Sequence, residues 1–497
     1  MKCLGTIAAV SAFATALLAA MAPQCSAKTY YVDQYGNDSA AGTSAAPVAT
    51  LLQAVYLANQ DYAGGSTPTG GDIININGNG KTYQLSWAGG GGVAQGNPVT
   101  VNTHATSAAP LIIQTTPGQS NAVLIGGNWL GTQDNIDLNG TYITVQNLTS
   151  QNAMGVNIDI PNGDYCTVQN CIATGAGWAG IMIGSTASNH QLQHDAVLNC
   201  VVHDNNQANN PTGKPGQDWA GSLVLSNCTN CNLQYNTVYH NYGEGIGMYS
   251  FGQTTTNNWV DNNTVYDNWS VEVYICNSTY NYVWNNLIYA DSNAILRPLF
   301  GGVSFPAIGI ASDNESTTQL CYGSQIYNNI VIGGQSCFRA ANQNTVSGFY
   351  AGGLNGYKIY NNVFYNTSPY NTTRVDPPCI QVDNDPGNNF TWENNIVWET
   401  NGIVPVAVDG GGGTQIKTTN CWDGTGGFNM NGPSDVLLWN TNPGFVSPGS
   451  LSASGYVLSA GSPCYSTGTN ATSVLTFDYN WAGRPSTGVW AMGAFYN

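Results

Sequence analysis

The sequence contains few charged residues, and basic residues are the scarcest of them. Lys and Arg together number 10 against 27 Asp and Glu, charged residues make up 7% of the chain, and the formal net charge is −17. Binding to nucleic-acid phosphates requires clusters of Lys and Arg, so this composition excludes a nucleic-acid partner. An acidic surface also repels an anionic polymer unless a cation or a local Arg compensates, which favours a neutral glycan.

Long apolar runs are also missing, apart from one near the start. Residues 1–27 combine Lys2, an apolar run from Ile7 to Ala22, and small residues up to Ala27, which is the pattern of a secretion signal. No other stretch is long and apolar enough to span a membrane. We therefore predict a secreted monomer, extracellular or periplasmic, with no membrane partner.

The cysteine content argues against a complete disulfide framework. The chain has 13 Cys, of which two precede residue 28, and the remaining 11 cannot all pair with one another. Cys171 and Cys200, and likewise Cys337 and Cys379, occupy matching positions of the repeats described below. If any disulfide links the repeats, these two pairs are predicted; the alternative is a stack of small buried thiols.

Glycine and asparagine are abundant, and the asparagines form a repeat. Ten times an Asn stands shortly before Val, Ile, Phe, Thr or Trp in matching surroundings, at spacings of 23 to 43 residues. The ten are Asn147, Asn170, Asn199, Asn236, Asn263, Asn286, Asn329, Asn362, Asn395 and Asn420. A period in the twenties, lengthened by insertions, indicates a solenoid.

Each repeat also carries a short apolar alternation, such as Ile181-Met182-Ile183. A period of two over so few residues indicates a half-buried strand. Stacked repeats would pair their strands in parallel, about 4.8 Å apart, and the Asn amides would hydrogen-bond along the stack. We predict an all-β, single-stranded parallel β-helix (β-solenoid) whose coils occupy residues 96–432.

The two ends of the chain differ from the repeats. Within residues 28–95, the stretch Thr50–Ala58 has helical spacing with Thr50 as the N-cap, so this segment is predicted to be a helix-containing N-terminal cap. Residues 433–497 are predicted to be a C-terminal capping segment.

Motifs at both ends resemble those of a known group. Tyr30-Tyr31-Val32, Gly42-Thr43 and Gly71-Asp72-Ile73 at the start, with Asn442-Pro443-Gly444-Phe445 and Asp478-Tyr479-Asn480 at the end, resemble secreted right-handed parallel β-helix proteins of the pectate-lyase-like superfamily. The resemblance covers nearly the whole chain and implies a right-handed helix. It implies little about the reaction, because this superfamily includes lyases, hydrolases, epimerases and non-enzymes.

The candidate catalytic residues are two carboxylates on neighbouring repeats. Glu244 and Glu272 lie between two insertions, Gln207–Trp219 and Ala290–Ala307, which we expect to form the walls of a cleft. Paired carboxylates on either side of a glycosidic bond serve as acid and as base or nucleophile. This pattern predicts a polysaccharide-cleaving glycoside hydrolase if both side chains face one groove.

Outward strand positions and residues of the two insertions are predicted to bind the substrate. These residues are Asp218, Trp219, Tyr249, Tyr274, Arg297 and Asp383. No cofactor and no metal site is predicted for the hydrolase.

Two alternatives remain open. One is a lyase acting on a uronate-containing glycan, with Arg339 or Arg297 at its centre and Ca²⁺ to neutralise the substrate. The other is a non-catalytic carbohydrate-binding or adhesin-like solenoid.

A second constellation consists of His203, His240 and Asp267, each four residues after a repeating Asn. Two His and an Asp in one column could bind a metal ion or move protons. A stack of polar turn residues bonded to the backbone is the favoured interpretation.

Overall fold

A computed structural model describes most of the chain. The described residues are 26–63, 68–85, 99–126, 134–184, 190–209, 220–298, 304–314, 321–341, 354–366, 378–382, 389–400, 407–409, 413–423, 432, 434–439, 441–473 and 475–496. The predicted secretion signal, apart from its last two residues, lies outside them. No helix among the described residues is long and apolar enough to cross a membrane.

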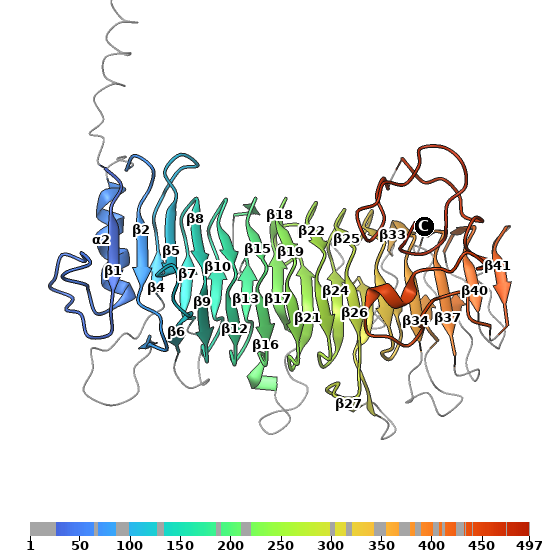
Figure 1. Cartoon of the computed structure of the whole chain (residues 1–497), viewed down its shortest axis with the longest axis horizontal. Coiled ribbons are helices and arrows are strands. Elements are labelled where there is room, and N and C mark those ends of the chain that lie inside the picture. Colours follow the sequence, from blue (N-terminus) through green and yellow to red (C-terminus); the bar gives the residue numbers. More distant parts are fainter. Residues whose placement is uncertain are drawn as a thin grey trace, which may run out of the picture.

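Most described strands stack into three long sheets, which we name I, II and III, around one core (Figure 1). Sheet I contains β1 (Thr29–Val32), β2 (Ile73–Ile76), β5 (Leu111–Thr115), β8 (Ile143–Gln146), β11 (Thr167–Gln169), β15 (Ala196–Leu198), β19 (Asn232–Gln234), β22 (Trp259–Asp261), β25 (Tyr282–Trp284), β30 (Gln325–Tyr327), β33 (Asn355–Tyr360), β36 (Asn389–Glu393) and β39 (Gln415–Thr418). Sheet II contains β4 (Val99–Val101), β7 (Ile136–Leu138), β10 (Ile158–Ile160), β13 (Ile181–Ile183), β17 (Gly221–Ser226), β21 (Glu244–Tyr249), β24 (Val271–Cys276), β29 (Ile308–Asp313), β32 (Phe338–Ala341), β35 (Ile380–Val382) and β38 (Ala407–Asp409). Sheet III contains β3 (Thr82–Gln84), β6 (Ala122–Ile125), β9 (Leu148–Gln151), β12 (Ile172–Thr174), β16 (Val201–His203), β20 (Thr237–Tyr239), β23 (Thr264–Tyr266), β26 (Leu287–Tyr289), β31 (Ile330–Ile332), β34 (Val363–Asn366), β37 (Ile396–Glu399), β40 (Cys421–Asp423) and β41 (Val436–Leu438).

The remaining elements are short or lie at the N-terminal end. They are α2 (Leu51–Asp61), the 3₁₀ turns Gln207–Asn209 and Ala453–Tyr456, the strand pair β14 (Leu192–Gln193) and β18 (Cys228–Thr229), and the antiparallel pair β27 (Arg297–Pro298) and β28 (Ser304–Phe305).

The apolar alternation produces this architecture as predicted. In neighbouring strands of sheet II, Leu223, Ile246 and Val273 lie in register and are fully buried in the core. The strands of the three long sheets pair in parallel, so each coil continues the core of the coil before it. The predicted all-β parallel β-helix is therefore confirmed.

The Asn ladder is confirmed for seven of the ten predicted positions and wrong for three. From Asn236 to Asn420, each ladder Asn donates through its main-chain N–H and its side chain to the Oδ1 of the next, as Asn236 does to Asn263 at 2.9 and 3.1 Å. In the earlier coils the inner position holds Leu148, Cys171 and Cys200, and the Cys200 amide donates to Asn236 at 2.9 Å. The preceding residues Asn147, Asn170 and Asn199 lie one position outward, in a left-handed turn conformation that Asn tolerates.

The predicted disulfide partners are neighbours but are not bonded. The Cys171 amide lies 3.4 Å from the Cys200 sulfur, and the Cys337 amide donates to the Cys379 carbonyl at 2.9 Å. All 11 cysteines after residue 25 are buried free thiols in this structure. Most of them fill small inward positions of the coils, whereas Cys276 lies in the outward apolar group of sheet II and Cys464 in the C-terminal segment.

Both predicted caps contribute strands to the long sheets of the solenoid. Helix α2 begins at the predicted N-cap, where the Thr50 side chain accepts from the Gln53 amide at 3.1 Å, yet β1, β2 and β3 already belong to the long sheets before residue 96. At the other end β41 extends sheet III, and Asp435 closes the Asn ladder by accepting from the Asn420 amide at 2.8 Å.

The C-terminal segment folds back along the later coils instead of covering only their end (Figure 1). Outward Asn side chains of successive coils donate to its carbonyl groups: Asn285 to Tyr479 at 3.2 Å and Asn394 to Thr469 at 2.8 Å. This segment covers the corner between sheets I and III.

Candidate active site

The outer face of sheet II carries the candidate site. Its strands alternate between core residues and a second apolar group that includes Met182, Val224, Tyr274 and Ala311. These outward residues lie in register on successive strands. The predicted insertions lie between β16 of sheet III and β17 of sheet II, and between β26 of sheet III and β29 of sheet II. Residues 210–219 and 299–303 of these insertions lie outside the described part of the chain.

Glu244 begins β21 and lies on this outer face, where it accepts a hydrogen bond from the Tyr249 hydroxyl. Gly247 makes this contact possible, because a Cβ there would stand 2.3 Å from the Tyr249 ring. The Tyr249 ring therefore lies over Gly247 and extends back along β21 toward Glu244 at the start of that strand. Burial and the charge of Glu244 raise the pKa of Tyr249 far above its usual value, so the hydroxyl stays a donor.

A second tyrosine–carboxylate pair lies beside the first. Its tyrosine is on the next strand of sheet II after β21, and its carboxylate is on the strand after that. The Tyr274 hydroxyl of β24 donates to Asp313, the last residue of β29, at 3.0 Å. The rings of Tyr249 and Tyr274 meet edge to face with centroids 5.9 Å apart. The contact between the two tyrosines thus links Glu244, at the start of β21, with Asp313, at the end of β29, into one cluster, in which Glu244 is 1% and Asp313 3% exposed.

Glu272 does not join this cluster, so the predicted pairing with Glu244 is wrong. Its carboxylate accepts from the Asn268 amide at 3.2 Å and from the Asn268 side chain at 2.5 Å. Asn268 belongs to a second inner ladder, which also contains Asn205 and Asn241. Glu272 closes this ladder inside the solenoid, and burial raises its pKa well above the usual value.

A local departure from strict alternation at the start of β21, which we call the Gly245 bulge, explains the error. A Cβ on Gly245 would lie 2.7 Å from the Asn268 amide nitrogen, so this position points inward. Its neighbour Ile246 also points into the core, and strict alternation therefore fails at the corner. Glu244 precedes the bulge and faces outward, whereas Glu272 occupies the inward position equivalent to Gly245.

The remaining predicted site residues are scattered. Arg339 lies beside Ala311 in the central outward column of sheet II and is partly exposed. Arg297 lies in β27, within the connection before β29, and its side chain is outside the described part. Asp218, Trp219 and Asp383 also lie outside the described residues.

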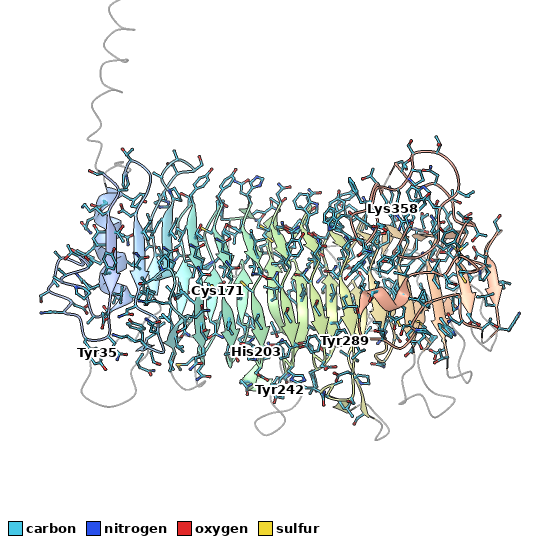
Figure 2. The ribbon with its side chains drawn as sticks, viewed as in Figure 1. Tyr35, Cys171, His203, Tyr242, Tyr289 and Lys358 are labelled. Atoms are coloured by element: carbon cyan, nitrogen blue, oxygen red, sulfur yellow. The ribbon has the colours of Figure 1, made fainter. Side chains whose placement is uncertain are left out.

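The predicted His column is shifted by one residue. His203 lies in register with Tyr239, and their rings begin a stack with centroids 5.0 Å apart that runs to Tyr289 along sheet III (Figure 2). His240 lies instead beside Asp267, with nitrogen and oxygen 3.8 Å apart. The prediction counted from Asn199, which is itself one position outward, and the error passed to His203.

One group of described residues has the composition of a metal site. Oxygen atoms of Asp134, Asp137 and Asp159, on the outer face of β7 and β10, all lie within 4.8 Å of one another. Oxygen-only donors suit Ca²⁺ and Mg²⁺ better than zinc or copper.

The sequence interpretation missed Asp313 and this acidic cluster. Asp137 and Asp159 stand at the middle of Ile-Asp-Leu and Ile-Asp-Ile, the same alternation that was recognised at Ile181 to Ile183. Extending that alternation toward the N-terminus would have found them. Asp313 had no such signal, because it ends its strand after the polar Ser312.

Neither a protein-family model nor a curated protein sequence matches the chain. Among solved structures, the fold is similar to pectate lyase Pel9A, at 16% identity and a TM-score of 0.55, covering 96% of this chain and 98% of that chain. XylC in complex with xylose is also similar, at 10% identity and a TM-score of 0.51, covering 94% of this chain and 98% of that chain. The chain therefore has a right-handed parallel β-helix fold like that of these two structures.

Proposed function

We propose that this protein is a secreted carbohydrate-active enzyme that hydrolyses a polysaccharide on the outer face of sheet II. The observation that carries the proposal is the cluster of Glu244 and Asp313, each bonded to a tyrosine hydroxyl. The fold supports it, since one similar structure is a pectate lyase and the other holds xylose.

In this proposal one carboxylic acid gives its proton to the glycosidic oxygen. The other carboxylate activates water or attacks the sugar carbon. Tyr249 and Tyr274 fix the orientation of the two carboxylates, which acid–base catalysis requires. Glu244 and Asp313 are nearly fully covered, so a sugar must displace the groups above them to react.

A panel of neutral and uronate-containing polysaccharides, scored for new reducing ends and for ultraviolet absorbance of unsaturated products, tests the proposal. Glu244→Gln and Asp313→Asn should each lower the rate of reducing-end release by at least ~10²-fold, a usual effect of losing a catalytic acid or base. Asp261→Asn is the matched control. It replaces a carboxylate that is 1% exposed on sheet I, bonded to Gln234 at 2.7 Å, and should leave the rate unchanged. Parent-like rates in both test variants would refute the hydrolase.

Arg339 supports a second candidate, a uronate lyase. It lies two strands beyond Tyr274 in the same outward column, where a cation can neutralise a uronate. A lyase would give unsaturated products and lose activity in Arg339→Ala. If no polysaccharide is cleaved but one is bound, the non-catalytic solenoid is favoured.

A further inference from the structure

Three carboxylates share a small volume near the start of sheet II. Asp137 of β7 and Asp159 of β10 are register neighbours, and Asp134 lies just before β7. Asp137 and Asp159 alternate with fully buried isoleucine and leucine residues, so their side chains lie on the outer face. One oxygen of each carboxylate lies within 4.8 Å of the other two.

The described surroundings provide little to neutralise this group. None of the five ion pairs among the described residues includes these three carboxylates. Asp134 accepts from the Val156 amide at 2.5 Å. Asp159 is 6% exposed and its Oδ1 has no hydrogen-bond partner, and the Oδ1 of Asp137 has none either. A buried ionised carboxylate without a partner is strongly unfavourable.

Burial and mutual repulsion raise the pKa values of Asp137 and Asp159. Burial, and then the charges of Asp134 and Asp137, raise the pKa of Asp159 well above its usual value. Burial and the charge of Asp134 raise the pKa of Asp137 to about 7.

We propose that Asp134, Asp137 and Asp159 form a binding site for a divalent cation, Ca²⁺ in particular. Ca²⁺ takes six to eight oxygens at about 2.3–2.6 Å, so oxygens on opposite sides of it stand about 4.6–5.2 Å apart. Three oxygens that lie within 4.8 Å of one another can therefore all contact one such ion. Water would supply the remaining ligands.

The site is separate from the proposed cleavage site. β10 and β21 are three strands apart in sheet II, or about 14 Å at the usual strand spacing. Met182, the register neighbour of Asp159 on the side of β21, offers no oxygen. The bound cation links the coils of β7 and β10, and its binding does not depend on the proposed function.

Calorimetric titration of the metal-stripped full chain with CaCl₂ tests the site. We expect one Ca²⁺ per chain, a melting temperature that rises with CaCl₂ and falls again with a chelator, and proton release near pH 6.5 when two buffers of different ionisation enthalpy are compared. Asp159→Asn and Asp137→Asn should each weaken binding at least tenfold. Asp261→Asn should bind as the parent does, because its carboxylate lies on sheet I.

Several outcomes would overturn the proposal. They are an absence of binding heat and of a melting shift at pH 8, and parent-like affinity in Asp159→Asn. If Asp159→Asn does not fold, the more exposed Asp137→Asn and proton release by the parent decide the question. Mg²⁺ prefers ligands at about 2.0–2.1 Å in strict octahedral geometry, so it should bind at least tenfold more weakly. Equal affinity for Mg²⁺ would overturn the assignment to Ca²⁺.

Discussion

Glu244 and Asp313 each accept a hydrogen bond from a tyrosine hydroxyl, whereas Asp134, Asp137 and Asp159 face one another. Both groups lie on the outer face of the same sheet and are largely covered. Each tyrosine stabilises the ionised form of its carboxylate, because a neutral hydroxyl donates a hydrogen bond to the negative charge. In the acidic cluster, Asp134 accepts from the Val156 amide, whereas one oxygen of Asp137 and one of Asp159 have no hydrogen-bond partner within the described residues. Neighbouring side chains, and not position on the sheet, therefore separate a candidate catalytic site from a candidate cation site.

The largest expected effect is a loss of activity that distinguishes the outward Glu244 from the inward Glu272. Glu244→Gln should lower the cleavage rate by at least ~10²-fold with little change in melting temperature. Glu272→Gln should leave the cleavage rate unchanged and lower the melting temperature. It removes one acceptor from the inner Asn ladder, which should cost about 1 kcal/mol of stability. Polysaccharide assays and thermal melting of both variants check this, and equal losses of activity would mean that Glu272 reaches the substrate.

The acidic cluster should make the calcium-free protein less stable as the pH rises. Burial and the charge of Asp134 raise the pKa of Asp137 to about 7 in the folded chain, so the folded chain binds its proton more tightly than the unfolded chain does. The resulting stability is complete below pH ~4 and is lost as the pH rises through about 7; the full shift corresponds to roughly 4 kcal/mol, and partial exposure reduces this to about 2.

Urea unfolding between pH 4.5 and 8 measures this dependence. Asp137→Asn should flatten it relative to the parent, and saturating CaCl₂ should restore stability at pH 8 in the parent alone. Identical slopes in the parent and in Asp137→Asn would show that the cluster does not titrate as expected. Asp261, whose pKa is raised to about 6 by burial, provides the comparison with an isolated carboxylate on another sheet.

The smallest effect concerns the tyrosines. Tyr274→Phe removes the 3.0 Å hydrogen bond to Asp313 and should cost about 1 kcal/mol of stability. Tyr266→Phe is the control, because that ring lies in the stack on sheet III, 5.0 Å from Tyr239. Thermal melting that ranks the two variants equally would mean that the Tyr274 hydroxyl contributes nothing to Asp313.

Sequence reasoning predicted the solenoid well and the site only in part. The alternation around Ile181 and the period of the later asparagines gave the strands, the ladder and the N-cap at Thr50. Counting from Asn199 failed, because the inner position of that coil holds Cys200. That single offset also misplaced His203. Tyr249 and Tyr274 were correctly placed on the outer face, but their carboxylate partners were not recognised as a group.

The sequence by itself determined the parallel β-helix, because alternating apolar residues and stacked amides act between neighbouring coils and repeat with the chain. Only the tertiary structure decided which residue faces outward at each corner. There the bulge at Gly245 sets two successive positions inward, since the Asn268 ladder fills the space that a side chain would need. Glu244 and Glu272 look equivalent in sequence, but packing against the next coil places one on the surface of sheet II and the other inside the solenoid.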